Sequence, residues 1–158
     1  MDRIGVVDTM FARYDMGAEA VDQLKQCPGF GTDFDVVHRT VPGFKDLAVE
    51  CKRIIESEGC LIVVALGMPG KADIDQVCAH EASQGIMAAQ LMTSTHILEV
   101  FVHELEEEDP AKLAAVCVDR ARKHALNAYW MLYEPEQLTC RAGQGVRQGY
   151  GDAGPILG

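Results

Sequence analysis

Short apolar runs alternate along the chain with longer segments in which apolar residues recur every three or four positions. The short runs predict β-strands at residues 4–7, 34–40, 60–66 and 96–103. The longer segments predict helices at residues 15–26, 46–58, 73–92 and 110–132. Strand and helix alternate four times, which is typical of a parallel sheet covered by helices on both faces. We therefore expect an α/β fold: a three-layer α/β/α sandwich with a four-stranded parallel sheet, formed by a single domain over residues 1–158.

The apolar spacing also predicts which face of each helix packs against the sheet. The first two helices should bury Met16, Ala20, Leu24, Leu47, Cys51, Ile54 and Ile55. The third helix, with Asp73 and Gln76 at capping-box spacing, should bury Ile74, Val77, Cys78, Gly85, Ala88, Ala89 and Met92. The last helix, with Pro110 in its first turn, should bury Ala114, Cys117, Val118, Ala121, Ala125, Ala128 and Leu132. Residues 140–158 contain six glycines and are expected to form a loop-like tail.

The third and fourth predicted strands differ in polarity. Residues 60–66 are apolar on both faces, as in a central strand covered on two sides. The fourth strand carries Glu99 on the same face as Phe101 and His103. A carboxylate in mid-strand is costly to bury without a partner. The fourth strand is therefore expected at an edge of the sheet, with Glu99 facing solvent, a ligand or another subunit.

Composition narrows the function classes. The net charge is −10, and Lys and Arg are scattered, so no basic patch for nucleic acid is expected. No apolar run reaches the length of a membrane span, and residues 1–7 do not have the form of a signal peptide. The six cysteines contain no Cys-x-x-Cys pair and are expected to be reduced. These features predict a cytoplasmic protein that binds neither nucleic acid nor membrane.

Ligands of open parallel sheets bind beyond the carboxyl ends of the strands. Those loops combine aromatic residues, glycines and charged groups, a mixture suited to a flat ring with polar edges. The resulting substrate-binding candidates are Thr9, Phe11, Ala12, Val41, Gly43, Phe44, Lys45, Asp46, Gly67 and Met68. Phe11 is equally compatible with a core position. The segment Gly67–Lys71 lacks the length and the hydroxyl residue of a Walker phosphate loop.

Two histidines are the candidates for contact with a substrate. His103 lies at the end of the fourth strand, where an imidazole is well placed for proton transfer, although an exposed histidine with no role is the alternative. His80 on the third helix is a substrate-binding candidate, although a structural histidine is the alternative. Residues 104–109 are acidic, but no ligand spacing identifies a metal site.

Taken in order, the segments of the chain resemble the archaeal riboflavin synthases. The resemblance runs through residues 6–16, 40–47, 65–71, 77–83, 90–93, 99–104 and 147–150, nearly the whole chain. That family is similar to the lumazine synthases: residues 41–43 match their Val-Pro-Gly turn, and Asp46 falls where they place a ribityl-binding glutamate. Their catalytic histidine has no counterpart here, since Ile74 falls near its place. Their phosphate-binding basic residues on the last helix are also not clearly kept.

The resemblance implies a lumazine synthase-like (flavodoxin-like) fold and a specific reaction. Two 6,7-dimethyl-8-ribityllumazine molecules would exchange a four-carbon unit, giving riboflavin and a ribitylamino-pyrimidinedione. It also implies a homopentamer with active sites between adjacent subunits. Phe11, Gly43, Phe44, Asp46, Gly67 and Met68 would line one half-site, and Glu99 and His103 of the neighbouring subunit would reach in as catalytic candidates. No organic cofactor is expected; dependence on Mg²⁺ or Mn²⁺ is a family-level expectation.

Three alternatives stay open at this stage. A lumazine synthase would share the fold and the ligand shape but would join a pyrimidine to a four-carbon sugar phosphate. A lumazine or flavin carrier would use the same pocket without turnover. The residue pattern by itself predicts only an α/β domain.

Overall fold

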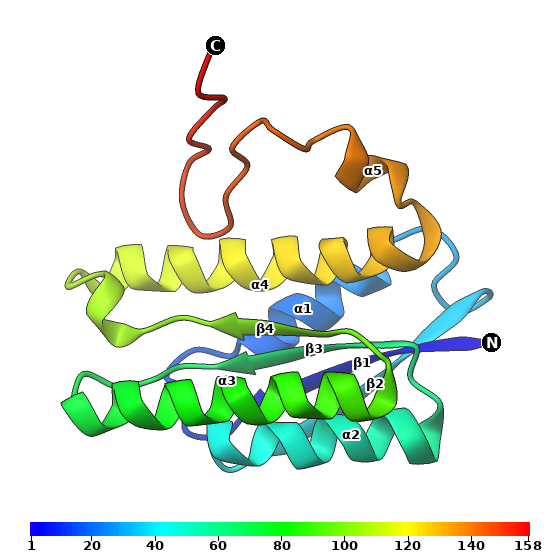
Figure 1. Cartoon of the computed structure of the whole chain (residues 1–158), viewed down its shortest axis with the longest axis horizontal. Helices are drawn as coiled ribbons and strands as arrows, with labels where there is room; N and C mark the ends of the chain where they lie inside the picture. Colours follow the sequence, from blue (N-terminus) through cyan, green and yellow to red (C-terminus); the bar gives the residue numbers. More distant parts are fainter.

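A parallel four-stranded sheet with the strand order β2-β1-β3-β4 forms the middle layer of the protein, as the computed structural model of residues 1–158 shows (Figure 1). Its strands are β1 (Asp2–Thr9), β2 (Phe34–Val41), β3 (Ile62–Gly67) and β4 (Ile97–Phe101). Helices α1 (Met16–Lys25) and α4 (Pro110–Tyr133) cover one face, and α2 (Leu47–Glu58) and α3 (Asp73–Thr93) cover the other. The predicted α/β/α sandwich is confirmed.

Each face of the sheet has its own hydrophobic core. Ile62, Val64 and Leu66 of β3 point toward α1 and α4, whereas Val63 and Ala65 point toward α2 and α3. Because β3 is buried on both faces, its continuous apolar run is accounted for. The predicted inner faces of α1, α2 and α4 are buried in these two cores, apart from a few positions at their margins.

The fourth strand lies at the edge of the sheet, as predicted, and pairs only with β3. Ile97 points into the core under α3, and Val100 points into the core under α4. Glu99 is paired in register with Ala65 and is half-buried, where its carboxylate accepts a hydrogen bond from the Ser83 hydroxyl. The carboxylate thus has a partner, which offsets the cost of its partial burial.

The predicted inner face of α3 is wrong except at Ala89, which is buried. The helix packs through Ile86 and through three alanines, Ala79, Ala82 and Ala89, whose small side chains allow it to lie close to the sheet and to α2. The larger apolar residues point outward: Ile74, Val77, Met87, Leu91 and Met92 are 51–83% exposed. The apolar stripe of α3 is therefore a surface of the single chain.

Two local signals determine helix ends. The Asp15 side chain caps α1 by accepting a hydrogen bond from Ala18 N at 3.0 Å, and Gly59 ends α2 in the left-handed conformation with φ 70°. Only one half of the predicted capping box of α3 forms, and it lies one residue earlier than predicted. Ala72 is the N-cap, and its backbone N–H donates to the Asp75 carboxylate at 3.1 Å.

After α4 the chain forms a short helix, α5 (Glu136–Thr139), and then the glycine-rich tail. The tail passes over the outer side of α4, and its last residues project away from the rest of the protein (Figure 1). The six cysteines are all unpaired. No helix combines the length and the apolar character that crossing a membrane requires.

Candidate active site

The loops after β1, β2 and β3 meet at the carboxyl edge of the sheet and form a cavity that we call the loop pocket. Its volume is about 380 Å³. The lining residues are Phe11, Arg13, Gly43, Phe44, Lys45, Asp46, Met68, Gly70, Asp75, Cys78 and Glu104. Five substrate-binding candidates from the sequence, namely Phe11, Gly43, Phe44, Lys45 and Asp46, therefore come together with a sixth, Met68.

Close packing of aromatic rings explains the glycines around this pocket. A Cβ atom on Gly43 would lie 3.0 Å from the Phe11 ring. A Cβ atom on Gly67 would lie 3.0 Å from the Phe101 ring and 3.1 Å from the Phe44 Cβ. Gly67 thus supports the wall of the pocket from behind, where the Phe44 and Phe101 rings lie 5.8 Å apart.

Phe11 is not a core residue, because its side chain is 68% exposed. A large exposed aromatic side chain beside a cavity is available to stack on a planar ligand. The alternative interpretation of Phe11 as a core position is wrong.

Polar groups at the rim of the loop pocket are held by neighbours. The Asp46 carboxylate accepts a hydrogen bond from Gly43 N at 3.1 Å, which fixes the carboxylate beside the glycine turn. The Lys45 ammonium donates to Glu81 of α3 at 2.9 Å, and this contact raises the pKa of Lys45. Both side chains are exposed and accessible to the hydroxyl groups of a ligand.

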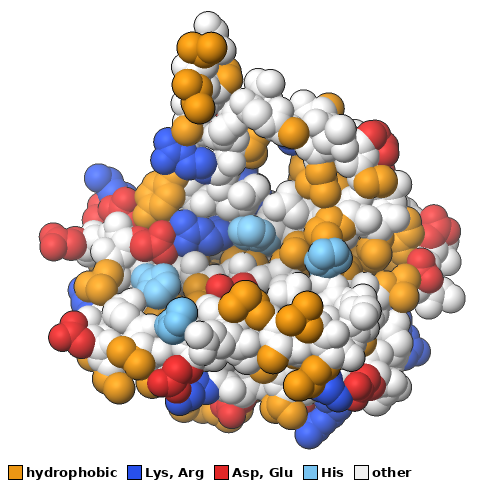
Figure 2. Space-filling model, viewed as in Figure 1, with side chains coloured by type: hydrophobic (Ala, Val, Ile, Leu, Met, Phe, Trp, Pro, Cys, Tyr) orange, Lys and Arg blue, Asp and Glu red, His pale blue; other side chains and the backbone are white.

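A second cavity, which we call the edge groove, lies along β4 between α3 and α4. Its volume is about 470 Å³. The lining residues are Gln76, Ala79, His80, Ser83, Glu99, Phe101, His103, Arg120 and His124. Figure 2 shows histidine side chains gathered along this face, next to basic and acidic groups. Glu99, His103 and His80, three candidates from the sequence, thus share one cavity.

The three histidines of the edge groove have different surroundings. Burial and the nearby Arg120 guanidinium lower the pKa of His124 to about 4, so His124 is neutral near pH 7. His80 is exposed, and its Nε2 lies 3.2 Å from Gln84 Nε2. His103 is half-buried, with its Nδ1 2.8 Å from Gln76 Oε1. Of the three, His103 has the side chain that is most firmly oriented within the groove.

Arg120 links the edge groove to the acidic segment after β4. Its guanidinium donates to both carboxylate oxygens of Glu106, at 2.8 and 2.9 Å, and to Phe101 O at 3.0 Å. Burial alone would raise the pKa of Glu106, but the bond from Arg120 outweighs it and the pKa is lowered. The same carboxylate accepts a hydrogen bond from His103 N at 2.8 Å. Sequence reasoning missed Arg120 and Glu106, because only the fold brings them together.

The tail is anchored on the same arginine. Gln148 O accepts a hydrogen bond from Arg120 Nε at 3.3 Å, and Gly149 N donates to Asp119 at 2.7 Å. The Tyr150 ring lies 5.7 Å from the Arg120 guanidinium carbon. Residues 148–150 therefore border the edge groove at its α4 side.

Gly149→Ala is expected to release this anchor. Gly149 has φ 92°, and an added Cβ would lie 2.7 Å from Arg120 Nη2. Backbone strain of this kind costs about 1–3 kcal/mol. This cost should weaken the contacts between the tail and α4, because the sheet does not depend on those contacts. The measurement is the rate of tryptic cleavage after Arg147, expected to rise by roughly 5-fold to 150-fold if cleavage follows the opened population. Gly151→Ala, at a position with no atom within 4 Å, is the matched control. Equal cleavage of both variants would contradict the anchor.

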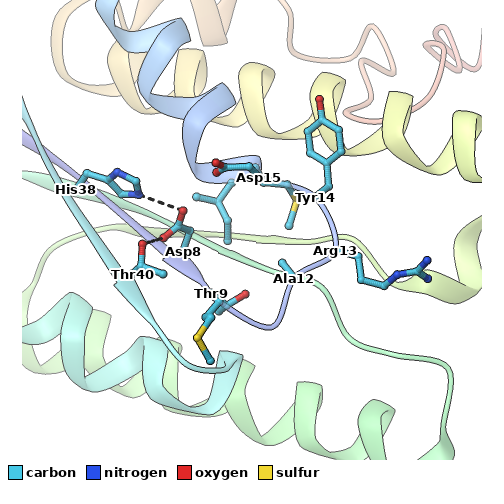
Figure 3. A pocket seen from close by; sticks show the side chains of 11 residues that line it. Asp8, Thr9, Ala12, Arg13, Tyr14, Asp15, His38 and Thr40 are labelled. Carbon is cyan, nitrogen blue, oxygen red and sulfur yellow. Dashed lines mark hydrogen bonds and ion pairs between the residues drawn. The ribbon is translucent and has the colours of Figure 1, made fainter.

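A third cavity, the β1 pocket, lies on the opposite side of the loop after β1, beside the start of α1. Its volume is about 350 Å³. Figure 3 shows Asp8 at its base, with the His38 Nε2 3.0 Å and the Thr40 hydroxyl 2.6 Å from the carboxylate. Thr9 and Ala12 line this cavity and not the loop pocket, while Arg13 points away from Asp8 and pairs with Glu104.

The Asp8–His38 pair should make stability depend on pH. Burial alone would raise the pKa of Asp8, but the bonds from His38 and Thr40 lower it. The bond to Asp8 raises the pKa of His38. The contribution of Asp8 is lost as pH falls through its lowered pKa. The contribution of His38 is complete below the pKa that His38 has in the unfolded chain. It is lost as the pH rises through the raised pKa of His38 in the folded chain. Both are complete only between about pH 4 and 6.5.

We expect His38→Gln to lower the free energy of unfolding by about 1 kcal/mol or less in that window, because His38 is partly exposed. The difference from the unmodified chain should shrink as the pH is raised to 9, as measured by urea unfolding at several pH values. His96→Gln is the control, since His96 makes no ion pair. A difference that stays constant from pH 5 to 9 would show that the pair adds nothing.

The remaining candidates are placed as follows. Val41 ends β2 and packs against the core under α2, outside the three cavities described. Gly67 lies behind the wall of the loop pocket, as described. No three His, Cys, Asp or Glu side chains of the single chain gather closely enough to hold a metal ion.

Comparison with known proteins shows the family of this chain. The family model described as 6,7-dimethyl-8-ribityllumazine synthase matches residues 2–135. The chain is 56% identical to the riboflavin synthase of Methanothermobacter thermautotrophicus, a match that covers 99% of this chain and 100% of that protein. It is 46% identical to the riboflavin synthase of Aeropyrum pernix, covering 97% of each chain. It is 41% identical to that of Archaeoglobus fulgidus, covering 98% of this chain and 99% of the other. On these matches and on its fold, the chain belongs to the 6,7-dimethyl-8-ribityllumazine synthase family.

Proposed function

We propose that this chain is a riboflavin synthase, which converts two molecules of 6,7-dimethyl-8-ribityllumazine into riboflavin and 5-amino-6-ribitylamino-pyrimidinedione. The observation that carries the proposal is the 56% identity, over essentially the full length of both chains, to a protein named riboflavin synthase. The reaction transfers a four-carbon unit from one lumazine to the other, so it needs two substrate sites that face each other. The enzyme gains most of its effect by holding the two rings in reacting geometry.

The loop pocket is suited to one of the two lumazines. The exposed Phe11 ring offers a stacking surface, and the glycine turn at Gly43 allows the edge of a ring to approach the backbone. Asp46 and Lys45 lie at the rim with an acceptor and a donor for the ribityl hydroxyl groups. The edge groove, with histidines and Glu99, offers the acid–base groups.

The two cavities of one chain do not face each other. Both are lined by the first turns of α3, but from opposite sides: Asp75 and Cys78 line the loop pocket, whereas Gln76 and Ala79 line the edge groove. Rings bound in the two cavities of one chain would be separated by the helix. This supports a complete site in which the loop pocket of one subunit meets the edge groove of the next.

The exposed apolar stripe of α3 supports such an assembly. Ile74, Val77 and Leu91 are 64%, 51% and 83% exposed, which is unusual for large apolar residues along one helix whose surface stays in water. A helix face of this kind is typical of a subunit contact. We propose that the stripe packs against a second copy of the chain, in the homopentamer that the family resemblance implies.

His103 is proposed to take the proton that leaves the ring methyl group of one lumazine. It lies in the edge groove with Glu99, and the low pKa of His124 makes the latter unsuitable as a base that becomes charged. Glu99 is proposed to face the positive charge that develops on His103. A positioned acid–base group contributes about 10²–10⁴-fold to a rate.

Two further properties belong to the proposal. The unpaired state of all six cysteines supports a reducing compartment such as the cytoplasm. Dependence on Mg²⁺ or Mn²⁺ would need ligands from the substrate or from a second subunit, since the side chains of one chain form no metal-binding group.

The proposal is tested by incubating the purified protein with 6,7-dimethyl-8-ribityllumazine alone and following both products, with and without EDTA. Riboflavin and the pyrimidinedione in equal amounts are expected. The description of the matching family model favours a second candidate, a lumazine synthase. No riboflavin, together with lumazine formation from the pyrimidine and a four-carbon sugar phosphate, would establish that candidate instead. Stoichiometric lumazine binding without any product would indicate a carrier.

A further inference from the structure

Gln76 of α3 lies between two groups that fix the direction of its side-chain amide. Its Nε2 donates a hydrogen bond to Gly70 O at 2.8 Å, and its Oε1 lies 2.8 Å from His103 Nδ1. A backbone carbonyl only accepts, so the NH₂ end of the amide must face Gly70. The reversed amide would place its oxygen against the carbonyl oxygen of Gly70, and two acceptors would then face each other.

The direction of the amide determines which nitrogen of His103 carries the proton. An amide oxygen only accepts hydrogen bonds, so the His103 Nδ1 opposite Gln76 Oε1 must be the donor. A neutral imidazole has one N–H, and with Nδ1 protonated the lone pair lies on Nε2. Gly70 is thereby connected to the base through the amide of Gln76.

The backbone on both sides of His103 is held as well. Its own N–H donates to Glu106 at 2.8 Å, and the N–H of Glu104 donates to Pro69 O at 3.0 Å. Glu106 is in turn bound by Arg120. The ring of His103 is therefore fixed at its backbone and at Nδ1, while no hydrogen bond from the chain occupies Nε2.

We infer that Gln76 is a positioning residue that keeps neutral His103 in the Nδ1–H form, so that Nε2 is the atom that accepts the substrate proton. The inference rests on the proposed function for the identity of that proton. When Nε2 takes it, the C–H bond of the ring methyl breaks and its electron pair remains on carbon, delocalised into the lumazine ring. The imidazole becomes an imidazolium whose Nδ1–H still donates to Gln76.

The primary test reads the tautomer directly and does not depend on turnover. Protein labelled with ¹⁵N at histidine is examined by long-range ¹H–¹⁵N correlation above the pH at which the histidines titrate, and His103→Ala assigns the signal. The unmodified chain is expected to carry the proton on Nδ1, and Gln76→Leu is expected to show a mixture of both forms. Gln76→Glu loses the bond to Gly70 O, and its second carboxylate oxygen should turn away from that carbonyl, but it keeps an acceptor opposite Nδ1 and should retain the Nδ1–H form.

A matched control and a kinetic measurement complete the test. Gln84→Leu removes the other glutamine–histidine contact of α3 and should leave the His103 tautomer unchanged. In Gln76→Leu, kcat should fall at least about two-fold with little change in KM. The decrease in kcat should be smaller than the decrease of about 10²–10⁴-fold that is expected when the acid–base group itself is removed. The carboxylate of Gln76→Glu should shift the acidic limb of the pH–rate profile upward, a change that a merely structural role would not produce.

The outcomes separate the inference from the proposed function. A proton on Nε2 in the unmodified chain, or an unchanged tautomer in Gln76→Leu, would overturn the positioning role. The expected tautomers together with undiminished turnover in Gln76→Leu and His103→Ala would leave the tautomer assignment intact and overturn His103 as the base.

Discussion

Replacing His103 with alanine is expected to lower kcat for riboflavin formation by about 10²–10⁴-fold. The ring is half-buried in the edge groove, where the contact between its Nδ1 and Gln76 Oε1 orients it. KM should change little, because the stacking and ribityl contacts are proposed to lie in the loop pocket. Steady-state kinetics with the lumazine as sole substrate measures both quantities.

The control for this variant is His96→Ala, which removes an exposed histidine at the start of β4, outside the three cavities. Circular dichroism and sedimentation should show that both variants keep the fold and the assembly state. Turnover by His103→Ala within a factor of two of the unmodified chain would contradict the catalytic role and leave Glu99 as the remaining candidate.

The second large effect is expected when two inactive variants are combined in one assembly. Phe11→Ala damages the loop pocket, and His103→Ala damages the edge groove. If each active site takes its loop pocket from one subunit and its edge groove from the next, a mixed assembly contains some sites built from two undamaged halves. For random mixing in equal amounts, about one quarter of the sites are intact, being the product of two probabilities of one half. Co-expression with two different tags and purification over both gives the mixed assemblies for assay.

The matched control combines Phe11→Ala with Phe44→Ala, which damage the same pocket. No subunit in that mixture supplies an undamaged loop pocket, so no activity should return. If the first mixture shows only the average of its two parent variants, the site lies within a single chain and the shared-site arrangement is wrong.

The sequence predicted the layers of this fold because its strongest patterns arise from burial. Residues 60–66 are apolar on both faces only because β3 is covered on both sides. Glu99 correctly indicated an edge strand, since the cost of burying a carboxylate limits where it can lie. These signals are local in sequence and do not require knowledge of the neighbouring elements.

The face of α3 was predicted wrongly for a physical reason. Apolar periodicity shows that a helix face avoids water, but not whether the core or another subunit covers it. On α3 the larger side chains, such as Ile74 and Leu91, point outward, and small residues such as Ala82 point inward. The helix therefore has two apolar faces, a buried face of mostly small residues and an exposed face of larger ones, which the periodicity does not separate.

The sequence predicted the loop residues of the candidate site but not the helical residues that hold the site in place. Phe11, Gly43 and Asp46 follow directly after strands, where the topology brings loop residues together. Gln76 and Arg120 lie within helices and have no local signal. Their partners, Gly70 and Glu106, are 6 and 14 positions away in sequence and are brought near only by the packing of helices against the sheet.

Glu99 has a further consequence, which concerns the tendency of the single chain to aggregate. Side chains occupy the two ends of the β4 edge, since Ile97 N donates to Gln90 and Phe101 O accepts from Arg120. Between them the edge is open to the addition of a strand of another chain. A charged side chain in the middle of such a strand makes that addition costly, because pairing would bring like charges of two copies together and remove them from water. The carboxylate proposed to assist the reaction is thus also expected to disfavour aggregation of the single chain along the edge of its sheet.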